Sequence, residues 1–286
     1  GGDKPQAGRS KRVVVNVGAR DGKGKGNNID PAYPLFAAGY KGIAVEPNDA
    51  FRGLLIENLA KPFGVEPIIA TPRPDNIVDI IQPNKRIDVL RMELAAHECD
   101  LLPPLLARYH PTVISVGYNA RFPPPLLVKL DYKEGFKTDQ RGHVYGCSLS
   151  WVTHLVMRPA KYRLVQVDWQ TATYVDEAHV ASLGLHADGV GDVEAYEMGY
   201  LRRKGRRERV WWTGDLEHLQ ERQSPQKLLQ RTRLWLQDNS DVCATGAVVC
   251  TRGSAVFGVT CGSLERVSFE VLSDPGHYAR AARELP

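Results

Sequence analysis

The chain has 286 residues, the length of one large domain or two ordinary ones. Hydrophobic residues make up 43% of it and charged residues 24%, which excludes wholesale disorder, collagen-like repeats and a disulfide-dense miniprotein. The formal net charge of +4 is too small to indicate a nucleic-acid partner by itself. No apolar run approaches the roughly 18 residues of a membrane span, so we expect a soluble chain without one.

The cysteines and the first residues bear on processing and location. Five cysteines occur without the spacing of a zinc site, so we predict no metal, and their odd number leaves at least one thiol free or bonded to another chain. The chain begins with glycine rather than methionine, which fits a processed product. Residues 1–12 are expected to form a flexible, basic lead-in. The compartment stays open, with an organellar location after removal of a targeting peptide as one alternative.

Strand and helix patterns alternate through the first part of the chain. Short β-branched or apolar runs predict strands at 13–17, 42–46, 65–70, 87–92 and 112–116. Helical patterns cover 31–39, 47–59, 74–81 and 98–109, the last interrupted at Pro103-Pro104. A helix at 149–157 and strands at 162–167 and 171–175 follow. The alternation predicts an α/β domain over residues 13–180, with a doubly wound, mostly parallel sheet.

Residues 181–286 differ in character and are expected to form a C-terminal α+β extension. It contains a basic run at 202–209 followed by Trp211-Trp212, a helix that begins at Ser224-Pro225, and a β-rich stretch over 242–272. We favour a solvated loop or a protein contact for the Arg202–Trp212 patch. Nucleic-acid binding is less favoured, because the whole chain is only mildly basic.

Two features at the ends of the first two predicted strands indicate a nucleoside site. A tight turn follows the first strand, and glycines there allow backbone N–H groups to approach a ligand. Glu46 ends the second strand, 28 residues after Gly18, where a carboxylate can accept hydrogen bonds from both ribose hydroxyls. The turn lacks G-x-G-x-x-G, which disfavours a nicotinamide cofactor. The alternative is a purely structural turn beside a solvated strand end.

Several ordered motifs between Arg12 and Val180 resemble one family. The motifs are Asn16-Val17-Gly18-Ala19-Arg20-Asp21-Gly22 for D-x-G-A-x-D-G, Ala44-Val45-Glu46-Pro47 for A-V-E-P, Pro74-Asp75-Asn76 for the end of T-P-D-N, and Gly117-Tyr118-Asn119 with Phe122-Pro123-Pro124 for E-Y-N and F-P-P. Together they resemble the FkbM-like methyltransferases, which have the class I S-adenosylmethionine-dependent (Rossmann-like) fold.

The resemblance implies S-adenosylmethionine as cofactor and an unknown methyl acceptor, with an oxygen nucleophile as the expected type. The residues that it implies for cofactor binding are Asn16, Gly18, Ala19, Asp21, Gly22 and Glu46, with Asp75 and Asn76 near the adenine. Glu46 would hold the ribose, and the glycine turn would line the methionine side.

The chain departs from the family where the acids of strands four and five should stand. The family's D-I-D-G is here Glu93-Leu94-Ala95-Ala96, and the Glu before Tyr-Asn is Gly117. The weak catalytic candidates that remain are Glu93, His97, Tyr118 and Asn119, although a lone histidine at a helix start is more commonly a surface or cap residue.

Two hypotheses follow. The first is an active methyltransferase whose acceptor chemistry differs from that of the family. The alternative is a degenerate methyltransferase-fold protein that serves as a structural or binding subunit of a larger assembly. That assembly could be organellar. The lost acids and the unmatched extension with its basic-aromatic patch favour this alternative.

Overall fold

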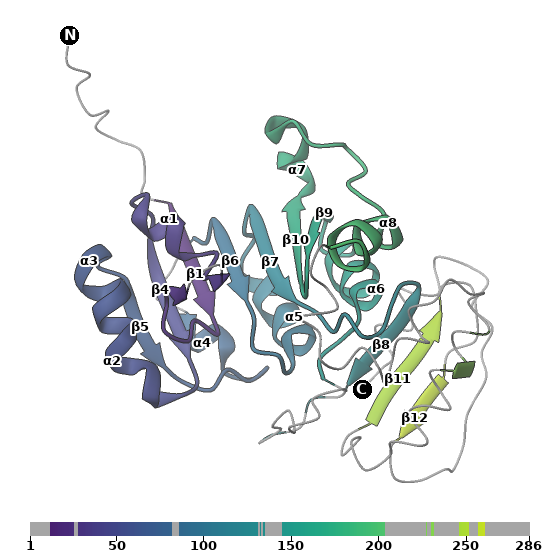
Figure 1. Cartoon of the computed structure of the whole chain (residues 1–286), viewed down its shortest axis with the longest axis horizontal. Coiled ribbons are helices and arrows are strands. Elements are labelled where there is room, and N and C mark those ends of the chain that lie inside the picture. Colours follow the sequence, from purple (N-terminus) through teal and green to yellow (C-terminus); the bar gives the residue numbers. More distant parts are fainter. Residues whose placement is uncertain are drawn as a thin grey trace.

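The computed structural model describes residues 12–25, 28–81, 86–130, 132, 134, 145–203, 227, 230, 231, 246–251 and 257–260. Seven strands form one sheet in the order β5-β4-β1-β6-β7-β10-β9 (Figure 1). Their bounds are β1 Val13–Val17, β4 Lys41–Glu46, β5 Glu66–Ile69, β6 Val89–Met92, β7 Val113–Gly117, β9 Tyr162–Asp168 and β10 Thr171–Asp176.

The strand directions confirm the predicted fold class. Strands β5, β4, β1, β6 and β7 pair in parallel, and β10 runs antiparallel to both β7 and β9. The reversed strand β10 lies between β7 and the edge strand β9. This arrangement is the Rossmann-like topology of the class I methyltransferase fold. In β1, Val14, Val15 and Val17 are fully buried, as expected for a parallel strand that is covered on both faces.

Short helical segments connect the strands. The α-helices are α1 Tyr33–Ala37, α2 Arg52–Leu55, α3 Lys61–Phe63, α4 Ile77–Ile81, α5 Glu98–Arg108, α6 Leu149–Trp151, α7 Glu177–Val180 and α8 Asp192–Tyr196. The 3-10 segments are η1 Asp49–Phe51 and η4 Ala181–Leu183, and the π-helical segments are η2 Ile56–Ala60, η3 Val152–Met157 and η5 Glu197–Leu201. Thus the predicted helix at 149–157 is present as α6 and η3.

The predicted interruption at Pro103-Pro104 was wrong, because α5 runs from Glu98 to Arg108 with both prolines inside it. Its buried face holds Leu101, Leu102 and Leu105, which pack on the sheet. A proline removes one N–H donor and crowds the preceding turn, which disfavours a helix locally. Here the apolar face on both sides of the prolines holds the segment in one helix.

The sequence patterns missed three of the described strands. Gly24–Lys25 (β2) and Asn28–Ile29 (β3) form a small hairpin within the glycine-rich stretch. Leu126–Leu130 (β8) pairs with Gly246–Thr251 (β11), which pairs with Phe257–Thr260 (β12), so that a three-stranded sheet lies beside the main one (Figure 1). β11 and β12 lie in the predicted β-rich stretch, whereas β8, which pairs with β11, lies where the sequence predicts no strand.

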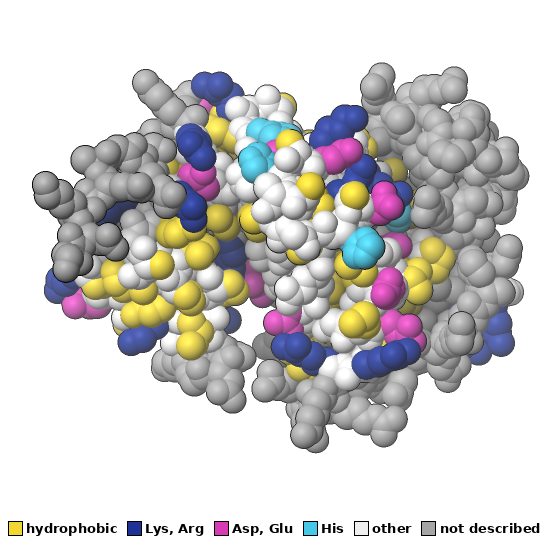
Figure 2. Space-filling model, turned by 90° about the horizontal axis from the view of Figure 1, so that it is seen from above, with side chains coloured by type: hydrophobic (Ala, Val, Ile, Leu, Met, Phe, Trp, Pro, Cys, Tyr) yellow, Lys and Arg dark blue, Asp and Glu magenta, His cyan; other side chains and the backbone are white. Residues whose placement is uncertain are grey.

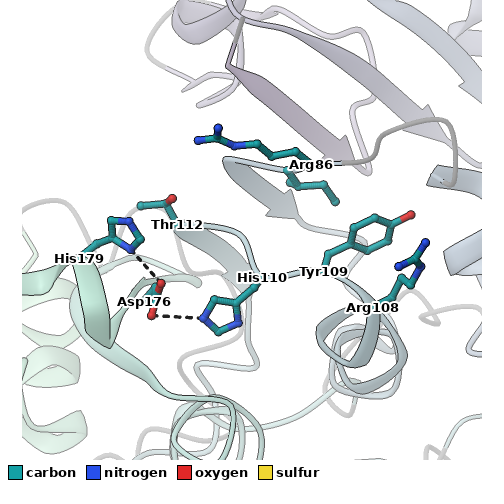
Figure 3. Close-up of a pocket in the computed structure, with 8 residues that line it drawn as sticks. Arg86, Arg108, Tyr109, His110, Thr112, Asp176 and His179 are labelled. Atoms are coloured by element: carbon teal, nitrogen blue, oxygen red, sulfur yellow. Dashed lines mark hydrogen bonds and ion pairs between the residues drawn. The ribbon is translucent and has the colours of Figure 1, made fainter. Parts of the chain in front are cut away.

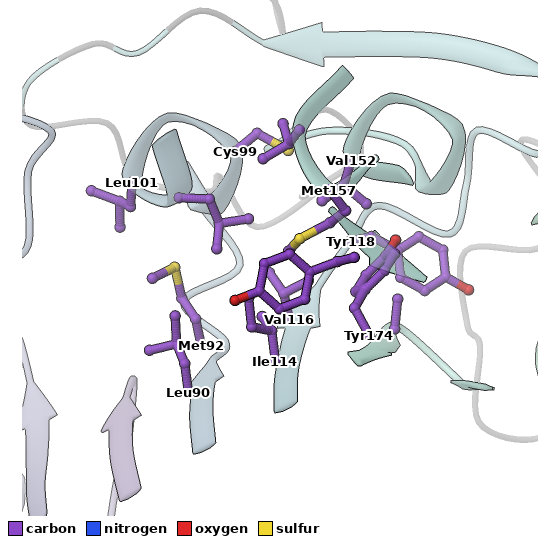
Figure 4. Close-up of a cluster of buried hydrophobic side chains, with 14 of the residues drawn as sticks. Leu90, Met92, Cys99, Leu101, Ile114, Val116, Tyr118, Val152, Met157 and Tyr174 are labelled. Carbon is purple, nitrogen blue, oxygen red and sulfur yellow. The ribbon is translucent and has the colours of Figure 1, made fainter. Parts of the chain in front are cut away.

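The main hydrophobic core lies between the sheet and the helices around α5 and α6 (Figure 4). Leu90 and Met92 from β6 and Ile114 and Val116 from β7 are fully or almost fully buried there. Tyr196 and Tyr200, in the predicted extension, belong to the same core. The Trp169 N–H also donates to the Gly199 carbonyl at 3.1 Å, so η5 packs closely on the β9–β10 turn.

A disulfide joins Cys99, in the first turn of α5, to Cys147, just before α6. The two Cα atoms are 6.3 Å apart and both side chains are buried. No spacing in the sequence indicated this pair. The bond connects two segments that follow β6 and β8 and that both border the carboxyl edge of the sheet.

Among the described residues, no helix is long and apolar enough to cross a membrane.

The disulfide yields a stability prediction. Replacing both cysteines (Cys99→Ala with Cys147→Ala) should lower the free energy of unfolding by about 2–4 kcal/mol under oxidising conditions, because the unfolded chain loses a cross-link. Urea unfolding of both proteins measures this difference, which should narrow when dithiothreitol is added. An equal loss in both conditions would show that packing, rather than the cross-link, carries the effect.

Candidate functional site

The residues singled out by the sequence gather at the carboxyl edge of the parallel strands. The glycine turn follows β1, Glu46 ends β4, Glu93 follows β6 and Gly117 ends β7. Asp75 and Asn76 lie in the loop after β5. Since ligands of doubly wound sheets bind at this edge, the topology brings the predicted cofactor residues together.

Glu46 contacts the glycine turn through its carboxylate. Its side chain accepts a hydrogen bond from Arg20 N at 2.7 Å and another from Asn48 N at 2.9 Å, one on each carboxylate oxygen. The residue is 5% exposed. A carboxylate has about four acceptor positions, so each oxygen keeps one acceptor position beyond these bonds.

The glycines of the turn serve close packing. Gly18 has a φ of +80°, and a Cβ there would lie 2.1 Å from the Glu93 carbonyl oxygen. A Cβ on Gly22 would collide with the Leu59 side chain. The N–H groups of Gly18 and Ala19 both donate to the Val45 carbonyl, at 2.9 and 3.1 Å. These glycines therefore allow close packing of the turn, and these two N–H groups hold the turn to β4.

Arg91 lies at the centre of the site, and the sequence analysis missed it. Its side chain, 9% exposed, projects from β6 beneath the turn after β1. Nη1 donates to the Gly18 carbonyl at 2.8 Å and to Asn16 Oδ1 at 3.1 Å, while Nη2 donates to Glu93 Oε2 at 2.6 Å. Nε is buried without a partner. One guanidinium thus fixes the turn after β1 and the acid after β6.

Asp30 supplies the carboxylate that Asn16 lacks. Asn16 Nδ2 donates to both Asp30 oxygens, at 3.2 and 3.3 Å, and Asp30 Oδ2 lies 3.6 Å from Arg91 Nη1. Asp30 also accepts from Ala32 N at 2.8 Å. The charge that the family motif carries on β1 is therefore present on the neighbouring loop. An arginine inside an otherwise apolar strand was the available signal for this network.

A buried acid lies beside Gly117. Glu98 is 2% exposed and accepts from the N–H groups of Leu94 and Ala95 at 2.8 and 2.7 Å. A Cβ on Gly117 would be 3.1 Å from Glu98 Oε1. Burial raises the pKa of Glu98, and the N–H donors oppose that change. Glu98 holds the loop after β6, in which Ala95 has a left-handed φ of +52°.

The other three catalytic candidates have structural contacts. His97 was expected at the surface or as a cap; it stands at the N-cap position of α5, makes no side-chain cap bond and is buried. Tyr118 donates through its hydroxyl to the Trp169 carbonyl at 2.7 Å, and burial raises its pKa. Asn119 donates to the Tyr145 carbonyl at 3.2 Å and accepts from Arg121 N at 3.1 Å. Glu93, with a side chain 40% exposed, is the most open of the four.

The remaining predicted cofactor residues contact their own loops. Asp21 Oδ1 accepts from Gly24 N at 2.8 Å, and Asn76 Oδ1 accepts from Arg73 N at 2.7 Å. Asp75 is exposed and paired with Arg73.

In the Arg202–Trp212 patch, Arg202 pairs with Glu197 and Arg203 with Asp168. Residues 204–212 lie outside the described part of the chain, as do the lead-in up to residue 11 and the predicted helix start at Ser224-Pro225.

The chain matches no protein-family model and no curated protein. Among solved structures it is similar to magnesium protoporphyrin IX methyltransferase from Synechocystis with bound S-adenosylmethionine (9% identity, 58% of this chain and 70% of that one, TM-score 0.37). It is also similar to an S-adenosylmethionine-dependent methyltransferase from Aquifex aeolicus (16% identity, 58% of this chain and 82% of that one, TM-score 0.33). A third similar structure is Haemonchus contortus phosphoethanolamine N-methyltransferase 1 (12% identity, 78% of this chain and 49% of that one, TM-score 0.36). The activity of this chain has to be argued from its own residues.

Removal of the Arg91 cation should destabilise the fold. Arg91→Met leaves the Asp30 carboxylate buried without its cation, and we expect a loss of about 3–5 kcal/mol in the free energy of unfolding. Urea unfolding measures it. Arg52→Met, which breaks an exposed pair with Asp49, is the matched control and should cost less than about 1 kcal/mol. A loss no larger than that of the control would contradict the role given to Arg91.

His97 should make stability depend on pH. Burial lowers its pKa to about 4, and the positive charge of Lys129 acts in the same direction. Between about pH 6.5 and 4 the unfolded chain takes up a proton here that the folded chain does not, so the free energy of unfolding falls as the pH falls, by about 3 kcal/mol at most. His97→Gln should flatten that dependence.

Urea unfolding of the wild-type chain, His97→Gln and the control His186→Gln at several pH values tests this prediction. Glu98 acts with the opposite sign, because its raised pKa favours the folded state at low pH, so the difference between the proteins isolates His97. His186→Gln alters an exposed histidine and should keep the wild-type slope. Identical slopes for wild type and His97→Gln would refute the assignment.

Proposed function

We propose that the chain is a S-adenosylmethionine-dependent methyltransferase that binds the nucleoside part of its cofactor beside Glu46. The observation that carries the proposal is the Glu46 carboxylate: it ends β4 at the ligand edge of a class I sheet and keeps one acceptor position on each oxygen. Two adjacent ribose hydroxyls are a matching pair of donors. The FkbM-like subfamily is part of this proposal and rests on the ordered motifs.

The residues at this edge fit the cofactor in charge as well as in place. S-adenosylmethionine, when bound, supplies a methyl group on a positively charged sulfur. Glu93, 40% exposed and held by Arg91 through Oε2 alone, presents a carboxylate after β6 that can accept from a cationic amine. Glu46 and Glu93 flank the turn after β1 and would hold the two ends of one extended ligand.

Methyl transfer needs an acceptor aligned with the methyl group and, for many acceptors, a base. Glu93 is the candidate for that role among the residues described here, because the hydroxyl of Tyr118 and the amide of Asn119 are occupied by backbone partners. An acceptor that ionises readily, such as a carboxylic acid, needs little help from a base. We therefore propose an oxygen acceptor of this kind.

A second function, binding without catalysis, is favoured by one observation. The carboxylate of Glu93 is already paired with Arg91 at 2.6 Å, so one of its two oxygens is engaged and is not available to a methyl acceptor. A chain that binds the nucleoside but transfers no methyl group would suit a structural subunit of a larger assembly, with the Arg202–Trp212 patch and the extension as contact surfaces.

Calorimetric titration with S-adenosylmethionine and S-adenosylhomocysteine tests the cofactor site. Glu46→Ala should weaken binding by about 1–3 kcal/mol, because two hydrogen bonds to a charged acceptor are lost. Asp49→Asn is the matched control: it removes an exposed acid three residues away and should leave the affinity unchanged. Thermal unfolding of each variant confirms that the β1 turn still folds.

Two results would contradict the proposal. If the wild-type chain does not bind, S-adenosylmethionine is excluded as the cofactor. If wild type and Glu46→Ala bind equally, Glu46 is not part of the cofactor site. If the cofactor binds, methyl transfer from labelled S-adenosylmethionine to carboxylic acids separates the two functions. Transfer by the wild-type chain supports the enzyme, and binding without transfer supports the structural subunit.

A further inference from the structure

A second cleft lies at the opposite edge of the sheet, away from Glu46. It has a volume of about 330 Å³, within the range of small-molecule sites. Arg86 precedes β6, His110 and Thr112 precede β7, and Asp176 ends the reversed strand β10, so the cleft opens at the amino ends of the parallel strands. Figure 2 views the molecule from this side and shows His, Lys and Arg side chains on the surface.

A buried carboxylate organises two histidines in this cleft (Figure 3). Asp176, with a side chain 7% exposed, lies 2.8 Å from His179 Nδ1 and 3.3 Å from His110 Nε2. Ala178 N also donates to it, at 3.1 Å. Burial opposes the ionisation of Asp176, but these three partners lower its pKa below the ordinary value. Each imidazole thus has one nitrogen on Asp176 and keeps the other for a ligand.

The arginines complete a basic lining. Arg86 donates to Asp88 at 2.6 Å through one nitrogen, and Asp88 also accepts from Val13 N. Arg108 lies over the Tyr109 ring at 5.8 Å and has no ion-pair partner among the described residues. The neighbouring Arg163 is paired with Glu177. The lining thus holds two arginines and two histidines with one carboxylate, Asp176, which the histidines already engage.

The composition of the cleft decides between a metal and an anion. In the described part of the chain, no group of three or more His, Cys, Asp or Glu side chains is placed to hold a metal ion. The guanidinium groups of two arginines, the ring N–H groups of two histidines and a threonine hydroxyl line one opening, and all of these are donors suited to the oxygen atoms of an anion. Arginine in particular matches the geometry of a phosphate group.

We propose that this cleft binds a phosphate group, either free or as part of a small organic ester, through Arg108, His110 and His179, with Arg86 and Thr112 at its rim. Asp176 acts as a positioning residue that holds both imidazoles. The site shares no residue with the proposed cofactor site, so neither depends on the other.

Calorimetric titration of the full chain with inorganic phosphate, glycerol 3-phosphate and sulfate tests the proposal. We expect saturable binding that Arg108→Gln weakens by about tenfold or more. Arg52→Gln makes the same change of charge at an exposed arginine of α2 and should bind like wild type. Glu46→Ala should also bind normally. Thermal unfolding confirms that each variant is folded.

The histidines are tested by substitution. The double variant His110→Gln with His179→Gln removes two of the proposed donors and should weaken sulfate binding by about tenfold or more. His186→Gln alters an exposed histidine that does not line the cleft and should bind like wild type. Tighter binding of the ester would identify an organic phosphate, and equal binding would identify free phosphate. No saturable binding, or binding unchanged by Arg108→Gln, would overturn the proposal.

Discussion

One buried guanidinium holds the ligand edge of the sheet together. Arg91 bridges the turn after β1, the loop that carries Asp30 and the acid that follows β6. A cation taken out of water costs several kcal/mol unless it is paired and hydrogen-bonded, so these partners and Arg91 require one another. Gly18 packs against the Glu93 carbonyl so closely that a Cβ there would lie 2.1 Å from its oxygen, so the turn after β1 and the segment after β6 fit together only with a glycine at this position.

The two edges of the sheet carry opposite chemistry. At the carboxyl edge, Glu46 and Glu93 offer acceptors, and their fixed partners are backbone N–H groups and Arg91. At the amino edge, Arg108 and the two histidines on Asp176 offer donors. The strands between them are buried and mostly apolar, with Asn16 and Arg91 as polar exceptions, so the groups at the two edges do not contact one another. A ligand rich in hydroxyl donors suits the first edge, and an oxyanion suits the second.

Local patterns were enough to predict the main sheet, because parallel strands covered on both faces are continuous apolar runs such as 13–17. The place of Glu46 followed from that topology. The sequence could not show that Gly22 serves packing against Leu59, or that Asp30 replaces the charge absent from Asn16, since both depend on contacts between distant segments. The predicted interruption of α5 at its two prolines was wrong for a similar reason, because tertiary packing outweighed the low helix propensity of proline.

The pairing of β8 with β11 has a consequence for synthesis of the chain. β8 emerges well before its partner, and until β11 is made one side of β8 presents unpaired backbone groups along Leu126–Leu130. Exposed edges of apolar strands are templates for pairing between molecules. Closure of so long a loop is also slow. The nascent chain therefore passes through a stage at which association competes with folding, and a protein cut short before β11 would remain at that stage.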